Sequence, residues 1–373
     1  WRASVMGLSG EAVDSSENGV RRLGLGRSSD QSRGLIRWLK DNPQDVVVSG
    51  NVAALEPAFP FIPPETLHIL HIHDAARAVR KRAMAAAPWA DGIACVGRHV
   101  ERQYAPELDR IGWKGLLTTI HNGADYPPEL PRATEGGPIR LLFMGRTDPF
   151  KGIYDCVDVL SSLTKRGVPA KLCIVGSGLE DGRIRRLFAR RGLSEQVEWT
   201  GWLPHADCFA KAAECDILLM PSRRDAFGMV TVEAMAMGCV PIAYDNASGS
   251  AEIIENGKNG ILVPFCNTKA AAAAIAALWA DRTRLSALSA AAAARARNDF
   301  NATLMTQRLM EFIIKAAEDA AAHPPSRINA LPPEQPESLG APRGFTRLPA
   351  GLRAWIRRTV YASPRLCRLV ISR

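Results

Sequence analysis

The chain has 373 residues, of which 47 % are hydrophobic and 23 % charged, and these values are typical of a globular protein and exclude a largely disordered chain. A chain of this length usually forms more than one domain. The formal net charge of +9 favours anionic ligands but is too small to indicate a dedicated nucleic-acid binder, so no nucleic-acid partner is expected.

The cysteines and the hydropathy pattern indicate a cytoplasmic protein. The eight cysteines are isolated from one another, without a C-x-x-C pair or a His/Cys metal spacing, so we expect reduced thiols in the core and no metal site. The sequence contains no secretory signal and no run of eighteen apolar residues that could span a bilayer.

Short β-rich runs alternate with helical stretches in the first third of the chain. Strands are predicted at 46–48, 67–72, 92–96 and 117–120, and helices at 31–41, 75–87 and 98–104. This alternation predicts a parallel sheet. A Gly/Pro-rich stretch at 126–138 interrupts the pattern, and we place the end of a first, Rossmann-like domain, residues 1–136, within it.

The pattern resumes in a second predicted domain, residues 137–300. Its strands are expected at 139–144, 171–175, 196–199, 216–220, 239–243 and 261–263, and its helices at 152–166, 180–191, 205–213, 230–237, 249–255 and 268–280, with an Ala-rich helical region at 269–296. Two doubly wound α/β domains in tandem are expected to face each other across a cleft. Open α/β sheets bind ligands at the carboxyl ends of their strands, so the site should draw on both domains.

The C-terminal part has three predicted segments: a helix at 301–322 that returns to the first domain, a Pro-rich linker at 323–345 and a basic tail at 346–373. The tail carries seven arginines and no acid. Its Leu352, Trp355, Ile356 and Val360 share one helical face. This pattern favours an interfacial membrane helix, and the alternative is a helix docked on an acidic face of the protein.

Two carboxylates flank a glycine turn in MPSRRDAFGMVTVEAMAMG, residues 220–238. Asp225 precedes Gly228, and Glu233 lies one turn inside the following helix. The free backbone N–H groups of Gly228, Met229 and Val230 at this helix start favour an anion, and a phosphate fits. Glu233 would repel a phosphate, so the economical interpretation is that it binds sugar hydroxyls of the same ligand.

Two cations follow the first strand of the second domain, in the segment GRTDPFKG at 145–152. The planar guanidinium of Arg146 can donate two parallel hydrogen bonds, and the ammonium of Lys151 is a compact charge. Together they could neutralise a diphosphate. The chain contains no D-x-D pair that would clamp a metal-bridged pyrophosphate, so we expect protein cations and helix amides in place of a metal ion.

These segments carry a resemblance to a known family. Together with LCIVGSG (172–178), VEWTGWLPH (197–205), NGILVP (259–264) and TTIHNGAD (118–125), they resemble the retaining family-4 glycosyltransferases of GT-B fold. The resemblance covers residues from about 90 to 265. The spacing of Asp225 and Glu233 matches the E-x7-E motif of that family, although Asp225 stands where the motif more often has Glu.

The resemblance implies roles for individual residues. Arg146 and Lys151 would bind the donor diphosphate, Glu233 the ribose, and Asp225 the donor sugar. The remaining implied site residues are Gly145 beside the diphosphate, Gly201 and Trp202 near the base, Phe227, Gly228, Met229 and Val230 at the distal phosphate, and His73 facing the donor sugar. His71 lies on the same side of its strand and is nearly as good a candidate by periodicity.

The implied activity is transfer of a sugar, with retention, from a UDP- or GDP-linked donor to an acceptor hydroxyl, without a cofactor. The alternatives are a sugar-nucleotide epimerase and an inactive nucleotide- or carbohydrate-binding protein. The basic tail suggests a glycan or a lipid-linked molecule as the acceptor and contact of the tail with the inner face of an anionic membrane. The family opens with a strand and a Gly-rich loop, neither of which is apparent before Val5, so the first domain is expected to be abbreviated.

Overall fold

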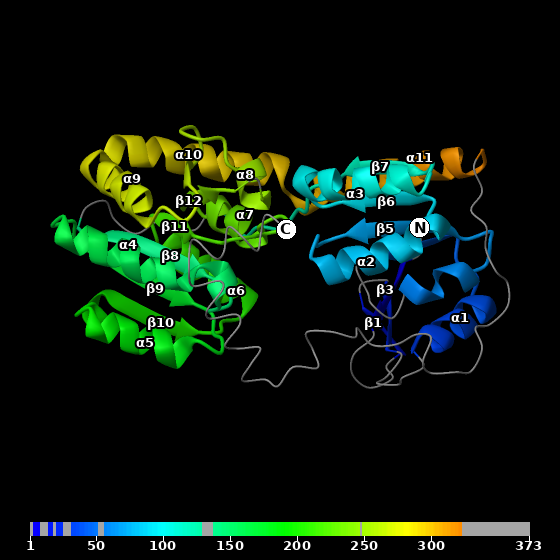
Figure 1. The fold of residues 1–373 in the computed structure, drawn as a ribbon, viewed down its shortest axis with the longest axis horizontal. Coiled ribbons are helices and arrows are strands. Elements are labelled where there is room, and N and C mark those ends of the chain that lie inside the picture. The colour runs from blue at the N-terminus through cyan, green and yellow to red at the C-terminus, as the bar shows by residue number, and fades with distance from the viewer. Residues whose placement is uncertain are drawn as a thin grey trace. The chain divides into compact units, whose positions relative to one another are not determined.

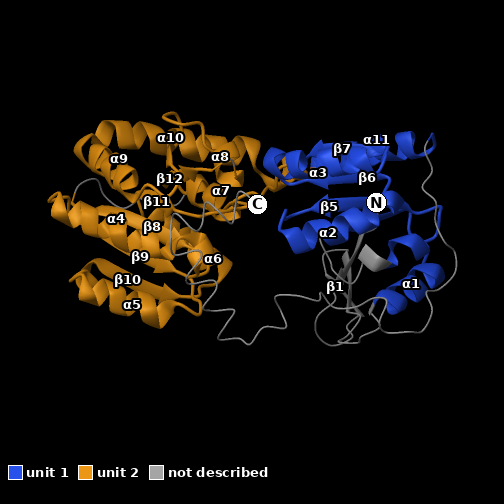
Figure 2. Cartoon of the chain, in the orientation of Figure 1, with its two compact units in different colours: residues 1–120, 307–344 blue, residues 121–306, 345–373 orange. Residues whose placement is uncertain are grey.

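The protein is described by a computed structural model in which the described residues are 3–7, 14–17, 20–24, 31–50, 56–128, 137–246 and 248–322. The chain divides into two compact units (Figure 2). Among the described residues, unit 1 comprises those up to Ile120 together with 307–322, and unit 2 comprises those within His121–Thr306. The predicted linker and basic tail lie outside the described residues.

Unit 1 contains a four-stranded parallel sheet of order β4-β5-β6-β7 (Figure 1). Its strands are β4 (Val46–Ser49), β5 (Leu67–Ile72), β6 (Gly92–Cys95) and β7 (Leu116–Thr119), and its helices include α1 (Gln31–Asp41), α2 (Arg77–Ala86) and α3 (Arg98–Arg110). Helix α11 (Ala302–Ala320) belongs to this unit from Gln307 onward. It packs directly on β6, since a Cβ added to Gly92 would lie 2.8 Å from Cζ of Phe312.

A second, small sheet near the start of the chain corrects one expectation. It has the order β1-β3-β2, with β1 (Ala3–Gly7) parallel to β3 (Val20–Gly24) and β2 (Asp14–Glu17) antiparallel to it. The expectation of no strand before Val5 is therefore wrong. The segment ASVMG has only two large apolar residues, too few for a period-two pattern, and the strand depends on pairing with β3. Residues 8–13, where a loop would follow, lie outside the described residues.

Unit 2 contains a six-stranded parallel sheet of order β10-β9-β8-β11-β12-β13 (Figure 1). Its strands are β8 (Ile139–Met144), β9 (Ala170–Val175), β10 (Val197–Gly201), β11 (Ile217–Met220), β12 (Val240–Asp245) and β13 (Ile261–Pro264). Its helices are α4 (Ile153–Lys165), α5 (Asp181–Arg190), α6 (His205–Ala213), α7 (Met229–Ala236), α8 (Gly249–Ile253), α9 (Thr268–Ala280) and α10 (Arg282–Asp299). Nearly continuous apolar runs bury the central strands on both faces, as doubly wound sheets require.

The predicted α/β class with parallel sheets is confirmed, and the predicted strands and helices agree with the structure to within a few residues in most cases. The clearest difference is α3, which continues through Pro106 to Arg110, although we predicted its end at residue 104. Burial of Tyr104 and Leu108 stabilises this extra turn and a half. No helix in the described ranges has both the length and the apolar character needed to cross a bilayer.

Candidate active site

The loop after β8 presents Arg146 to solvent. Gly145 has a φ of 140°, a conformation that glycine adopts far more readily than other residues, and its N–H donates to the carbonyl of Val175 at 2.9 Å. The Arg146 side chain is 75 % exposed, and its Nε lies 3.3 Å from the Asp148 carboxylate. An exposed ion pair of this kind is weak, so the guanidinium remains available to an anion.

The same loop directs Lys151 toward the end of β11. Asp148 accepts a hydrogen bond from the backbone N–H of Lys151 at 2.9 Å and caps the short 3-10 turn Pro149–Lys151. Gly152 follows with a φ of 76°, and an added Cβ there would lie 2.0 Å from the carbonyl oxygen of Pro221. Only a glycine allows this close approach, which brings the loop against the segment that carries Asp225.

Lys151 and Asp225 form an ion pair that the sequence did not indicate. The pair is well shielded, with side-chain exposures of 23 % for Lys151 and 8 % for Asp225. The ammonium contacts Oδ1 of Asp225, while Oδ2 is buried and has no hydrogen-bond partner among the described residues. Because a buried carboxylate oxygen without a partner is costly, the contact with Lys151 is important for holding Asp225 in this position.

A buried network fixes the chain two residues before Asp225. The Arg223 guanidinium donates to both carboxylate oxygens of Asp155, at 2.7 and 2.8 Å, and the Tyr244 hydroxyl donates to the same carboxylate. Burial, followed by the negative charge of Asp155, raises the pKa of Tyr244 far above its ordinary value, so the hydroxyl keeps its proton. This bidentate pair was missed because its partners lie 68 residues apart.

Gly228 forms the start of α7 and has a φ of 101°. Its added Cβ would lie 2.9 Å from Oγ of Ser250 and 3.2 Å from Oγ1 of Thr231, and these two hydroxyls are themselves 3.2 Å apart. The left-handed turn leaves Gly228, Met229 and Val230 only partly buried at the positive end of the helix dipole. This arrangement can bind a phosphate through backbone N–H groups.

Helix α8 contacts this turn through its first residue, Gly249. The N–H of Gly249 donates to the carbonyl of Asp225 at 3.0 Å, and a Cβ at Gly249 would lie 2.2 Å from the carbonyl oxygen of Phe227. The side-chain amide of Asn246 donates to the carbonyls of Ser222 and Arg223 at 3.0 and 3.1 Å. The contacts of Asn246 and Gly249 thus hold the loop between β11 and α7 in place.

Glu233 lies one turn inside α7 and contacts His205, the first residue of α6. Its Oε1 is 3.0 Å from Nε2 of His205, with side-chain exposures of 13 % for the glutamate and 64 % for the histidine. Only a small part of the carboxylate is therefore accessible. Ribose hydroxyls could replace the exposed His205 as its hydrogen-bond partner. His205 was not a predicted site residue, although it ends the quoted segment VEWTGWLPH.

Gly201 is the last residue of strand β10, and Trp202 follows it. Gly201 has a φ of 72°, and its carbonyl accepts from the N–H of Gly176 at 2.7 Å. Trp202 is 76 % exposed, which is unusual for so large an apolar side chain. An exposed aromatic ring beside a strand end can stack on a nucleotide base.

A further contact that the sequence analysis did not predict supports Phe227. The Nε2 atom of His121 lies 3.2 Å from Oε2 of Glu252, and both side chains are mostly buried. The imidazole lies 5.6 Å from the ring of Phe227 and 5.7 Å from that of Phe300. This cluster fixes the residue immediately before Gly228, and its two polar members are 131 residues apart in sequence.

His71 and His73 lie at the carboxyl end of β5 in unit 1, with ring centroids 4.2 Å apart. Burial, followed by the charge of His73, lowers the pKa of His71 from 6.5 to about 4, and burial also lowers the pKa of His73. Both rings are therefore neutral at pH 7 and could accept or donate a hydrogen bond. The structure thus brings both candidates together at one strand end.

Within unit 2 a chain of contacts links Arg146, Asp148, Lys151 and Asp225, while Glu233 is held separately by His205. In the described part of the chain no group of three or more His, Cys, Asp or Glu side chains could hold a metal ion. The roles predicted for these residues stay predictions.

The sequence of this region is similar to known proteins. Residues 131–297 match the family model described as Glycosyl transferases group 1. A glycogen synthase of Mycobacterium tuberculosis is 28 % identical over 199 residues, which cover 52 % of this chain and 48 % of the relative. The chain therefore spans about half the length of this curated relative.

Solved structures share the fold over most of the chain. A sucrose-phosphate synthase from Thermosynechococcus elongatus superimposes with a TM-score of 0.72 at 18 % identity, covering 85 % of this chain and 90 % of that one. The protein Alr3699/HepE from Anabaena, solved in complex with UDP-glucose, gives a TM-score of 0.67 at 18 % identity, with coverages of 79 % and 86 %. These similarities confirm the predicted GT-B fold class, an α/β fold with two parallel sheets.

Proposed function

We infer that this protein, whose residues 131–297 match the family model described as Glycosyl transferases group 1, transfers a hexose or related sugar from a nucleotide-diphosphate donor to an acceptor hydroxyl with retention. One observation carries the inference: the chain of contacts from Arg146 through Asp148 and Lys151 to Asp225, next to the partly exposed amides at Gly228. Two cations and a helix start within one unit suit a diphosphate.

The proposed chemistry depends on stabilising the leaving group. As the glycosidic bond breaks, negative charge grows on the diphosphate, and Arg146, Lys151 and the amides from Phe227 to Val230 would stabilise it. The donor diphosphate would also attract the Lys151 ammonium, which pairs with Asp225 in this structure. Glu233 would orient the ribose and Trp202 the base, while the acceptor attacks from the face that the leaving group vacates. No protein nucleophile is needed in this scheme.

The relatives suggest the class of substrates. The HepE structure contains UDP-glucose, and glycogen synthase builds a polysaccharide, as its name states. We therefore propose a UDP-linked hexose as the first donor to test, with GDP-linked sugars as the second. The acceptor would be a glycan or a lipid-linked molecule. His73, with His71 as the alternative, would face the donor sugar from unit 1.

We also propose a cytoplasmic location with peripheral contact to an anionic membrane. The basic, amphipathic sequence of residues 346–373 supports this contact, because arginines beside an apolar face bind anionic lipid surfaces. Sedimentation with vesicles containing phosphatidylserine tests it. Binding should weaken as the salt concentration rises, and equal binding to neutral vesicles would contradict the electrostatic part of the proposal.

Incubation of the protein with UDP- and GDP-sugars tests the activity. Release of the nucleotide with a glycosylated product supports transfer, and NMR of the product should show the anomeric configuration of the donor. Inversion at C2 of the sugar would identify an epimerase instead, and tight binding without turnover an inactive binding protein. Arg146→Ala and Lys151→Ala should lower kcat more than they raise the Kd of the nucleotide, since the charge they neutralise grows in the transition state. If neither variant slows turnover, the proposed site is wrong.

A further inference from the structure

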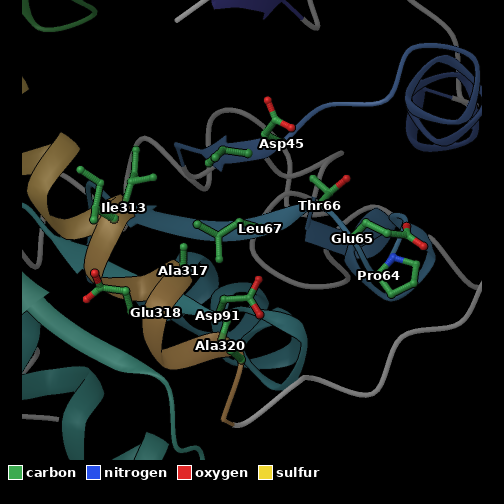
Figure 3. Close-up of a pocket in the computed structure, with 13 residues that line it drawn as sticks. Asp45, Pro64, Glu65, Thr66, Leu67, Asp91, Ile313, Ala317, Glu318 and Ala320 are labelled. Atoms are coloured by element: carbon green, nitrogen blue, oxygen red, sulfur yellow. The ribbon is translucent and has the colours of Figure 1, made fainter.

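A cavity of about 750 Å³ opens in unit 1 at the amino ends of β4, β5 and β6, against the C-terminal half of α11 (Figure 3). The proposed reaction does not use it, since its candidate residues of this unit, His71 and His73, lie at the opposite, carboxyl end of β5. A six-residue strand separates the two ends by roughly 20 Å. The residues that line the cavity are Asp45, Val46, Pro64, Glu65, Thr66, Leu67, Asp91, Ile313, Ile314, Ala317, Glu318, Ala320 and Ala321.

The lining combines an acidic edge with an apolar wall. It includes four carboxylates, those of Asp45, Glu65, Asp91 and Glu318, and no Lys, Arg or His. Asp91 is buried and accepts the backbone N–H of His68 at 2.6 Å, whereas the other three acids are exposed. An occupant of this cavity should therefore be cationic.

The apolar wall is a second stripe on α11. The helix already buries Phe312, Ile313 and Ala316 in unit 1. Ile314 and Ala317 of α11, and Ala321 directly after its last residue, follow at spacings of three and four, so they form a neighbouring stripe that faces the cavity. Ile314 is 50 % exposed, although isoleucine is normally among the most buried residues. The occupant should thus also have an apolar face.

We propose that this cavity is the docking site of the chain's own basic segment, residues 346–373. This segment carries seven arginines and no acid, the charge complement of the cavity edge. Leu352, Trp355, Ile356 and Val360 recur at helical spacing and supply the apolar face that the α11 stripe requires. The arginines between them, Arg353, Arg357 and Arg358, would meet Asp45, Glu65 and Glu318.

The course of the chain favours this occupant over others. The described chain ends at Ala322, next to Ala320 and Ala321 in the cavity wall. Residues 323–345 then separate the cavity from the basic segment, and a Pro-rich chain spans up to roughly 3.1 Å per residue, which is ample for a return. Such a tether holds a ligand at about millimolar effective concentration, so modest contacts suffice for docking.

Docking and membrane contact would compete, because both use the same apolar face. In the docked state the arginines and Trp355 are covered, and release exposes them to lipid. The donor site lies in unit 2, so neither state should alter nucleotide binding. Failure of the docking proposal is thus distinguishable from failure of the proposed function.

Hydrogen exchange of the full chain, in dilute buffer without lipid, tests the proposal. We expect slow exchange at residues 352–360 and 313–321 in the wild type. Glu65→Lys with Glu318→Lys should accelerate exchange at both segments about tenfold or more, and Arg357→Glu with Arg358→Glu should do the same. Combining the two pairs reverses both charges and should restore protection. Asp109→Lys, a reversal of an exposed acid on α3 that does not line the cavity, is the matched control and should change nothing.

Four results would overturn the proposal. Fast exchange of residues 352–360 in the wild type would mean that the segment does not dock. If residues 352–360 stayed protected from exchange in both charge-reversal variants, the segment would dock on another surface. If their protection rose with protein concentration, the occupant of the cavity would be a second copy of the chain. Protection that requires phosphatidylserine vesicles would leave membrane contact as the role of the segment. Unchanged nucleotide affinity in all variants verifies that unit 2 remains folded.

Discussion

Asp225 and Lys151 form an ion pair that is largely shielded from solvent, so each side chain stabilises the other. Replacing Asp225 by Asn leaves a shielded ammonium without its counter-charge, and replacing Lys151 by Met leaves the carboxylate with both oxygens unsatisfied. We expect each change to lower the free energy of unfolding by about 1 to 3 kcal/mol. The double variant should be less destabilised than the sum of the single changes, because it leaves no unpaired charge.

Urea unfolding of the four proteins measures this coupling. The control is Arg146→Ala, whose ion pair with Asp148 is exposed, so its loss should cost at most about 1 kcal/mol. Strict additivity of Asp225→Asn and Lys151→Met would show that the ion pair does not form in solution.

Glu233 provides a test of nucleotide binding. Glu233→Ala removes one charge-assisted contact to the proposed ribose, which is worth about 1.5 to 3 kcal/mol, so the Kd for the nucleotide should rise roughly ten- to a hundredfold. His205→Ala is the control, because it removes the partner of Glu233 and leaves the carboxylate in place. Calorimetric titration with UDP and GDP measures both variants. A Kd that stays constant in Glu233→Ala would remove this residue from the site.

His71 should make unit 1 sensitive to acid. Its pKa is lowered to about 4 in the folded protein, whereas the unfolded chain takes up the proton near pH 6.5. The unfolded state therefore binds more protons between these values, and the free energy of unfolding should fall as the pH drops from 6.5 to 4, by about 3 kcal/mol in total. Nε2 of His71 is buried without a hydrogen-bond partner among the described residues, which agrees with a neutral ring.

The pH dependence is measured by urea unfolding between pH 4 and pH 7, in the wild type and in His71→Gln. The variant cannot take up this proton, so its stability should vary less over the same range. Equal slopes in the two proteins would assign the acid sensitivity to other groups.

At the scale of elements, the turn that starts α7 is held by α8. Gly249→Ala would place a Cβ 2.2 to 2.4 Å from the backbone of Phe227, so the turn must move. We expect a loss of about 1 to 3 kcal/mol in stability, as for other overpacked sites, together with weaker nucleotide binding. Gly182→Ala in α5 is the control, since its nearest contact is the flexible end of Arg186 at 3.6 Å, and it should be neutral or stabilising. Nucleotide affinity equal to wild type in Gly249→Ala would separate α8 from the phosphate turn.

The same elements show what the sequence could predict. Strands and helices followed from local periodicity, and Gly228 followed from its place between a strand end and a helix, because these signals lie within a few neighbouring residues. The contacts that hold the site residues in place could not be predicted from such local signals. Arg223 meets Asp155 across 68 residues and His121 meets Glu252 across 131, and no local pattern identifies such partners. The ion pair of Lys151 and Asp225 was missed for the same reason, at a separation of 74.

At the scale of the whole molecule, each compact unit has its own parallel sheet, so the two units should respond separately to perturbation. Gly92→Val tests unit 1, because the new Cβ would lie 2.8 Å from Phe312, 3.0 Å from Ile69 and 3.2 Å from Ala316. Overpacking between β6 and α11 should cost about 1 to 3 kcal/mol. Gly34→Ala in α1 is the control, since nothing lies within 4 Å of its added Cβ.

A nucleotide should act on the other unit. A ligand that binds only the folded state stabilises it by about 2.7 kcal/mol at a hundredfold excess over its Kd, so UDP or GDP should raise the unfolding temperature of unit 2. Scanning calorimetry with and without nucleotide should therefore show two transitions, one lowered by Gly92→Val and the other raised by the nucleotide. At the same nucleotide concentration this transition should rise less in Glu233→Ala, because the variant binds the nucleotide more weakly. If the nucleotide instead raised the transition that Gly92→Val lowers, its principal binding site would lie in unit 1.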